Sequence, residues 1–175
     1  MPETTSGKTS LRELNALPAD AFVQIVGPVF EHSPWIAEAA APQRPFATVE
    51  ALLAALKGIV AASGPEKQLA LIRAHPDLAG RLAQAGQLTA ESTREQASAG
   101  LNQADPATVQ KLQSLNAAYQ ARFGFPFIIC ARLNHVAGIL SAMETRLEQG
   151  REPEISTALA EIGKIAELRL RDLIQ

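Results

Sequence analysis

The sequence predicts an all-α fold: a single-domain helical bundle of roughly eight or nine helices. Apolar residues make up 47% of its 175 residues, enough for one packed core, whereas aromatic residues make up only 5%. Alanine and leucine are abundant, and this composition favours helices over sheets. Capping residues, prolines and glycines divide the chain into segments whose apolar residues recur at helical spacing. We expect residues 9–175 to form this domain and residues 1–8 to form a disordered tail.

The helices of the N-terminal half are expected to begin at capping residues or prolines. Ser10 begins a capping box ahead of the first helix. Ser33 is expected to cap a short helix that has Pro34 at its first position. An apolar stripe at helical spacing follows Thr48 and continues to Ala62. The expected starts are Ser10, Pro18, Ser33, Thr48 and Pro65.

The helices of the C-terminal half follow the same punctuation. Pro76 is expected to begin a helix with Asp77 in its first turn, where a carboxylate complements the helix dipole. Thr89 and Asp105 are expected to cap the next two helices, which end at Gly100 and Gly124. A helix from about Asn134 precedes Gly150, and the last helix begins near Pro153 and runs to the C-terminus. The expected ranges of these helices are 89–99, 105–123, 134–149 and 153–175.

One segment, Phe125–Ala131, does not follow the helical pattern. It is apolar and β-branched, and Pro126 biases Phe125 toward an extended backbone. No second strand-like run exists to pair with it, yet its buried backbone groups need partners. Two alternatives stay open: the segment starts a helix, or it remains extended and offers some of its backbone groups to a ligand.

Composition excludes several classes of protein. A net charge of −2 leaves no electrostatic footprint for nucleic acid or for an anionic membrane. The most apolar stretch, Ala51–Ala62, is short and interrupted by Lys57, which excludes a membrane span. The N-terminal residues do not resemble a secretory signal, and Cys130 is the one cysteine, so no intramolecular disulfide is possible. These features predict a cytoplasmic protein without nucleic-acid or membrane partners.

His75 is the first candidate for chemistry, because Pro76 places it at a boundary between two expected helices. An imidazole at the positive end of a helix dipole is favoured in its neutral form near pH 7. A neutral imidazole accepts one proton and donates another, as a general acid–base must. The alternative is a histidine that only closes the start of a helix.

Ser92, Glu95 and Gln96 are the second candidate, because their spacing places them on one face of a helix. The residues around them, Ala90 and 97–100, are all small, so a ligand can approach this face closely. The alternative is an ordinary solvated helix face.

The remaining polar residues predict less. His32 and His135 are expected to be structural, in a loop and near a helix start. No metal site is expected, because metal-ligand spacings are lacking, and no nucleotide-binding or nucleophile-elbow motif exists. Arg169 lies at the edge of an apolar stripe and is a candidate to bind a carboxylate, although most arginines are surface residues.

Together, five segments resemble the OHCU decarboxylase family, which acts on 2-oxo-4-hydroxy-4-carboxy-5-ureidoimidazoline (OHCU) in urate breakdown. Each segment alone is weakly specific, but their order and combination are specific. The resemblance covers residues 10–172. The segments are Glu31–Trp35, Ala74–Ala79, Ser92–Leu101, Phe125–Arg132 and Glu161–Leu170.

The resemblance implies an all-helical, cofactor-free enzyme, usually a homodimer, that converts OHCU to (S)-allantoin and carbon dioxide. It implies that His75 and Glu95 are catalytic. It also implies a set of substrate-binding residues, of which Arg169 has the shortest supporting motif. That set is Pro76, Ser92, Thr93, Arg94, Glu95, Gln96, Phe127, Ile128, Ile129, Cys130, Ala131 and Arg169.

Two other functions stay open at this point. The chain could be a non-catalytic helical module that binds a small ligand through the same cleft. It could also be an enzyme of the same fold that acts on another ureide. Ligand binding without release of carbon dioxide would favour the non-catalytic module. Product analysis on a panel of ureides would distinguish an enzyme for OHCU from an enzyme for another ureide.

Overall fold

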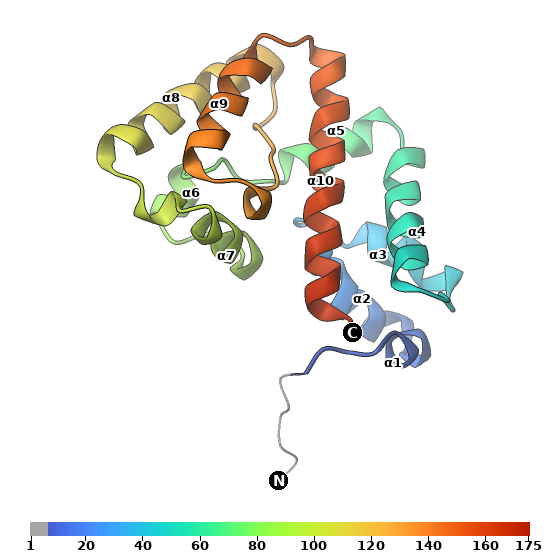
Figure 1. Cartoon of the computed structure of the whole chain (residues 1–175). Helices are drawn as coiled ribbons and strands as arrows, with labels where there is room; N and C mark the ends of the chain where they lie inside the picture. Colours follow the sequence, from blue (N-terminus) through green and yellow to red (C-terminus); the bar gives the residue numbers. More distant parts are fainter. Residues whose placement is uncertain (1–6) are drawn as a thin grey trace. The chain divides into compact units, whose positions relative to one another are not determined.

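A computed structural model describes residues 7–175, with the side chains of residues 81 and 82 excepted. The described residues form α-helices, short 3₁₀-helices and no strand; Thr9 and Ile174 make one isolated parallel bridge. The predicted all-α class is confirmed (Figure 1). The α-helices are α1 (Leu11–Ala16), α2 (Ala19–Val26), α3 (Trp35–Ala40), α4 (Val49–Ala62), α5 (Pro65–Arg73), α6 (Arg81–Gln84), α7 (Ala90–Ser98), α8 (Pro106–Phe123), α9 (Val136–Leu147) and α10 (Arg151–Leu173). The 3₁₀-helices are η1 (Gly27–Val29), η2 (Ala41–Gln43), η3 (Leu101–Gln103) and η4 (Ala131–Leu133).

Several helix starts are fixed by the predicted capping side chains. Ser10 and Glu13 form the complete capping box at α1. Thr48, Thr89 and Asp105 accept hydrogen bonds from first-turn N–H groups of α4, α7 and α8. These contacts are local, so a few neighbouring residues are enough to predict them. The predicted tail, by contrast, falls largely on residues 1–6, which lie outside the described residues.

The prediction of a helix at Pro76 is wrong. After α5 ends at Arg73, the chain passes through a turn, and α6 begins only at Arg81. Ala79 in this turn has a φ of 50°, in the left-handed region. Residues from α7 and α8 bind the backbone of this turn, and a local sequence pattern does not contain that information.

The predicted capping role of Ser33 is also wrong. Its hydroxyl donates to the carbonyl oxygen of Glu31 at 2.9 Å, and α3 starts without a side-chain cap. Of the alternatives for the segment after α8, the extended one is confirmed. Residues 125–130 form no helix, and η4 begins at Ala131.

The chain divides into two compact units. Unit 1 is the chain up to Gly64 together with Ala166–Gln175, and unit 2 is Pro65–Ile165. In unit 1, α3 packs against α2 and α4. Its fully buried side chains include Phe22, Ile36 and Leu52.

Unit 2 contains α5 to α9 and the first part of α10, and α8 and α9 lie side by side in it (Figure 1). Its core holds the aromatic rings of Tyr119, Phe123, Phe125 and Phe127. The Tyr119 ring centroid lies 4.5 Å from that of Phe123 and 5.4 Å from that of Phe127. The extended segment is therefore anchored in the core by its own phenylalanines.

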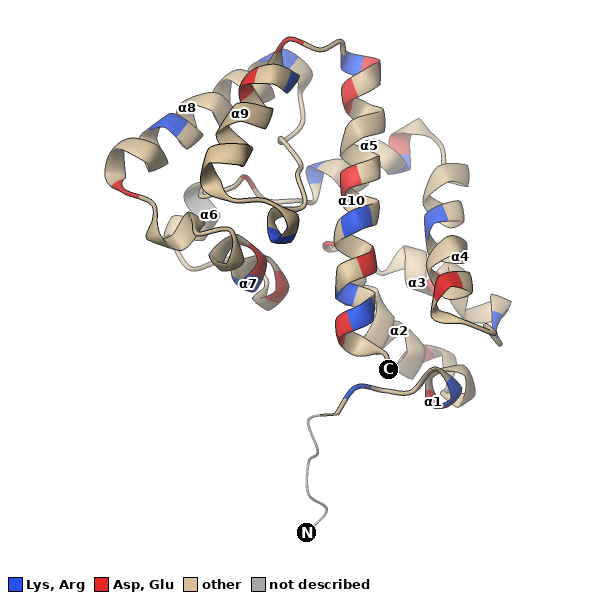
Figure 2. Ribbon diagram, in the orientation of Figure 1, with Lys and Arg blue, Asp and Glu red and all other residues tan. Residues whose placement is uncertain are grey.

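Charged side chains of both signs are spread over the helices, and α10 carries both acidic and basic positions along its length (Figure 2). Among the residues that the structure describes, no helix is long and apolar enough to cross a membrane.

Candidate functional site

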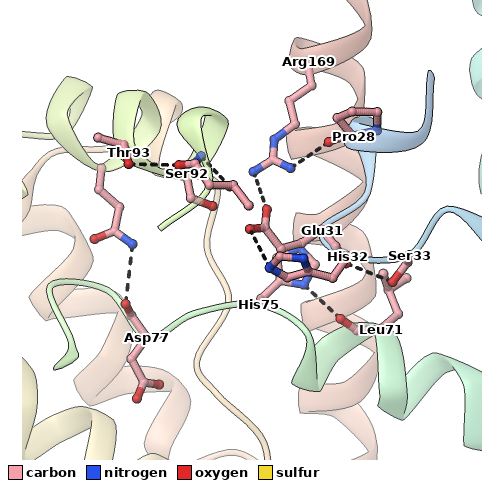
Figure 3. A network of polar contacts seen from close by, with 12 residues as sticks. Pro28, Glu31, His32, Ser33, Leu71, His75, Asp77, Ser92, Thr93 and Arg169 are labelled. Atoms are coloured by element: carbon pink, nitrogen blue, oxygen red, sulfur yellow. Dashed lines mark hydrogen bonds and ion pairs between the residues drawn. The ribbon is translucent and has the colours of Figure 1, made fainter. Parts of the chain in front are cut away.

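His75 lies directly after α5, in the turn that leads to α6. The residue is 9% exposed, and its Nδ1 lies 2.9 Å from the carbonyl oxygen of Leu71 (Figure 3). Because a carbonyl only accepts hydrogen bonds, Nδ1 carries a proton. In the neutral ring Nε2 is then the basic nitrogen. The argument from a helix N-terminus is wrong, since His75 follows the C-terminal end of α5.

Helix α7 presents the polar triplet partly inward. Ser92 and Gln96 are 5% and 6% exposed, so the alternative of an ordinary solvated face is wrong for them. Glu95 is half-buried, whereas Thr93 and Arg94 are exposed. Ser92, Glu95 and Gln96 therefore share a face that is at least partly buried, whereas Thr93 and Arg94, which lie between them in the sequence, are exposed to solvent.

The side chain of Gln96 connects α7 to the turn after His75. Its Oε1 accepts a hydrogen bond from the Ala79 N–H at 2.9 Å, and its Nε2 donates to the Asp77 carbonyl oxygen at 3.4 Å. From α8, Asn116 donates to the carbonyl oxygen of Leu78 at 2.9 Å. The structure therefore brings the turn and α7 together within unit 2. Partial desolvation raises the pKa of the Asp77 carboxyl in this turn.

Residues 127–130 form a buried, extended segment that leads into η4 at Ala131, and α7 packs against η4. The carbonyl oxygen of Ile128 accepts from Arg146, and that of Cys130 accepts from Asn134 and from the Leu133 N–H. The N–H groups of residues 127–131 have no acceptor among the described residues.

The thiol of Cys130, in the extended segment, interacts electrostatically with a carboxylate of α7. Burial raises the pKa of its thiol, and the carboxylates of Glu161 and Glu95 raise it further. The charge of Glu95 therefore acts on the Cys130 thiol. Glu161, which the sequence analysis gave no role, is 8% exposed.

Arg169 belongs to unit 1 and is 5% exposed. Its Nη2 lies 2.9 Å from Oε2 of Glu31, and its Nη1 donates to the Pro28 carbonyl oxygen at 3.1 Å (Figure 3). Glu31, the partner of Arg169, was not among the predicted site residues, although it begins one of the five segments of the resemblance. The available signal was a carboxylate placed directly after the apolar pair Val29 and Phe30.

The other two histidines have the predicted structural places. His32 is exposed in a loop, with its Nε2 3.8 Å from a Glu31 oxygen. His135 caps α9 by accepting from the Gly138 N–H at 3.3 Å. Over residues 7–175, no group of three or more His, Cys, Asp or Glu side chains is arranged to hold a metal ion. The absence of a metal from the reaction stays a prediction.

The family model described as OHCU decarboxylase matches residues 15–171. The chain belongs to the OHCU decarboxylase family. The resemblance found in the sequence is thereby confirmed, and membership makes the chain a carboxy-lyase of urate degradation.

Individual relatives agree with this assignment. The chain is 41% identical over 166 residues to the 2-oxo-4-hydroxy-4-carboxy-5-ureidoimidazoline decarboxylase of Halalkalicoccus jeotgali, covering 95% of this chain and 92% of that one. A crystal structure of (S)-allantoin synthase superposes with a TM-score of 0.76 at 30% identity, covering 95% of this chain and 54% of that longer one. An OHCU decarboxylase crystallised in the presence of (S)-allantoin gives a TM-score of 0.66 at 26% identity, covering 79% of this chain and 89% of that one.

Proposed function

We propose that this enzyme decarboxylates OHCU to (S)-allantoin, with His75 as the acid–base and Glu95 assisting it. The observation that carries the proposal is the hydrogen bond from His75 Nδ1 to the Leu71 carbonyl oxygen, which makes Nε2 the base of the neutral ring. The unpaired N–H groups of residues 127–131 in the same unit add backbone donors for the amide oxygens of the substrate.

The chemistry of OHCU explains how the reaction proceeds without an added electron acceptor. A hydroxyl and a carboxylate share one ring carbon, and the neighbouring ring carbon belongs to a C=N bond and carries the ureido group. When the carbon–carboxylate bond breaks, its electron pair forms a carbon–carbon double bond and the imine nitrogen accepts the displaced pair. The ring nitrogen that accepted the electron pair takes up a proton, the enol loses its hydroxyl proton, and the ureido carbon takes up a proton on one face. The enzyme must orient the carboxylate out of the ring plane and deliver that proton.

His75 is proposed to take the proton of the ring hydroxyl through Nε2 as carbon dioxide leaves. General acid–base catalysis of this kind is worth about 10²–10⁴-fold in rate. Glu95, half-buried on α7, is proposed to orient the substrate or the imidazole and to influence its protonation. Positioning of the carboxylate supplies much of the remaining acceleration.

The other residues are proposed to bind the substrate. Pro76 would contact it beside His75, and Ser92 would hydrogen-bond a ring or ureido amide. The amide of Gln96 already binds the turn after His75, so its proposed role is to shape that wall as well as to reach the ligand. Thr93 and Arg94 are exposed and would border the ligand from the rim. The set is completed by residues 127–131 and by Arg169 as a partner of the carboxylate or ureido group.

The test generates the unstable substrate in situ and follows both carbon dioxide release and the optical activity of the allantoin formed. His75→Ala should lose about 10²–10⁴-fold in rate while its circular dichroism spectrum stays that of the folded protein. His32→Asn is the matched control, because asparagine tolerates the left-handed φ of 47° at that exposed position. Near-wild-type activity of His75→Ala would end the acid–base assignment.

A panel of related ureides in the same assay defines the substrate.

We also propose that the enzyme is a cytoplasmic homodimer, as the resemblance to its family suggests. Light scattering of the purified chain measures the oligomeric state, and a single peak at the monomer mass would contradict the homodimer. Fractionation of the source cells measures whether the enzyme is cytoplasmic.

A further inference from the structure

We propose that Arg146 is a positioning residue for the decarboxylation: it orients the backbone of the extended segment through the Ile128 carbonyl group. The inference rests on the proposed function, in which residues 127–131 bind the substrate through backbone groups. Arg146 lies on α9, and sequence analysis gave it no role.

The guanidinium of Arg146 makes contacts to two consecutive residues of the segment. Its Nη1 donates to the Ile128 carbonyl oxygen at 2.6 Å, and its central carbon lies 4.2 Å from the centroid of the Phe127 ring. The side chain is 11% exposed, and Nη2 is buried without a hydrogen-bond partner among the described residues. A buried donor of this kind is unfavourable unless the ring face compensates for it.

Two further side chains hold the guanidinium in place. Glu154 is 1% exposed, and its Oε1 accepts from Arg146 Nε at 2.9 Å and from the Tyr119 hydroxyl at 2.6 Å. Burial and the neighbouring Glu154 raise the pKa of Tyr119, so this hydroxyl stays a neutral donor. The Tyr119 ring also meets the Phe127 ring edge-on, at an angle of 89°. The network therefore holds the segment through both a ring and a carbonyl group.

The geometry of the peptide bond transmits this contact to the ligand side. The Ile128 carbonyl and the Ile129 N–H belong to one planar trans peptide unit, in which the two groups point in opposite directions. Fixing the Ile128 oxygen toward Arg146 consequently fixes the Ile129 N–H away from Arg146. That N–H is one of the donors without an acceptor among the described residues. Fixed donors bind a ligand and stabilise its developing charge better than mobile ones do.

Arginine suits this position because its planar fork bonds Glu154 and Ile128 at once. The ammonium group of lysine is a single point of charge on a flexible stem. Lysine keeps the counter-charge of Glu154, so the fold is expected to survive, but it does not reproduce the two fixed contacts. Arg146→Lys therefore separates positioning from bulk stability.

The experiment compares wild type, Arg146→Lys, Arg146→Met and the exposed control Arg12→Lys in the in situ assay. We expect Arg146→Lys to raise KM, and the Kd for (S)-allantoin measured by calorimetry, about tenfold with a small change in kcat. Arg146→Met should raise both further and lower Tm. Partial unfolding alone has a different signature: it lowers kcat with the folded fraction and leaves KM unchanged.

The outcomes distinguish this inference from the function on which it rests. Wild type without carbon dioxide release would reject the proposed function. Active wild type together with an Arg146→Lys variant of unchanged KM and product Kd would reject only the role of Arg146. A fall in kcat that follows the folded fraction, with KM unchanged, would also reject it.

Discussion

Helix α7 and residues 127–131 both border the proposed site in unit 2, but they are held in different ways. Helix α7 pairs its backbone within the helix and begins at the Thr89 cap, and the neutral amide of Gln96 ties it to the turn after His75. Within the described residues the extended segment belongs to no helix or sheet, and a largely buried ion pair between Arg146 and Glu154, together with the Tyr119 hydroxyl, holds it. A backbone left unpaired for a ligand therefore depends on side chains from other helices.

The largest expected effect comes from breaking the ion pair behind the segment. Glu154→Ala leaves the buried Arg146 without its counter-charge and Tyr119 without its acceptor, which should cost about 3–5 kcal/mol of unfolding free energy. Urea denaturation measures the change. Glu152→Ala, an exposed position in the same helix, should stay within about 0.5 kcal/mol of wild type. A loss below about 1 kcal/mol in Glu154→Ala would mean that the segment does not depend on this pair.

A smaller loss of stability is expected when the hydrogen bond between Gln96 of α7 and the turn after His75 is removed. Gln96→Leu leaves the Ala79 N–H without its acceptor and should cost about 1–3 kcal/mol, less than the ion pair. The same denaturation assay measures it, with the exposed Gln87→Leu as the control. If Gln96→Leu lowered the free energy of unfolding as much as Glu154→Ala, α7 and residues 127–131 would depend equally on their side-chain contacts, and the contrast between them would disappear.

A smaller effect is expected at the start of α7. Thr89→Ala removes the oxygen that accepts from the Ser92 N–H at 3.2 Å and should cost about 1 kcal/mol. Thr89→Ser keeps a capping hydroxyl and should remain near wild type. Thermal unfolding of the two variants resolves the difference. Equal Tm values would show that the cap contributes nothing to this helix.

The smallest effect concerns α8, the helix that carries Tyr119. The N–H of Thr108 donates to Asp105 and lowers the pKa of this exposed carboxyl. A lowered pKa in the folded state stabilises the protein at neutral pH, and this contribution is lost as pH falls below about 4. Asp105→Asn keeps a capping oxygen without the charge, so its stability should fall less steeply between about pH 4 and pH 2. Denaturation curves across that range measure the slope, and parallel curves would contradict the expectation.

Local signals predicted the parts of the molecule that local contacts hold. The Thr89 cap and the shared face of Ser92 and Gln96 follow from spacing within one helix, whereas the sequence left open whether that face is buried. The extended backbone after α8 fits Pro126 and its β-branched neighbours, although the sequence also left a helical start open and favoured it.

The failures share a physical cause, which is contact at long range in the chain. The turn after Pro76 replaces a helix because Gln96 and Asn116, 17 and 38 residues away from their partners, bind its backbone. Arg146 acts on a carbonyl group 18 residues earlier. A pattern of capping residues and apolar spacing contains none of these pairings.

The thiol of Cys130 can report how often the extended segment opens to solvent. It is the one thiol in the sequence, it is 1% exposed, and its raised pKa keeps it protonated. A thiol in that state reacts with alkylating reagents only when its surroundings open. Its labelling rate in the native protein therefore counts openings of the segment, without any introduced probe.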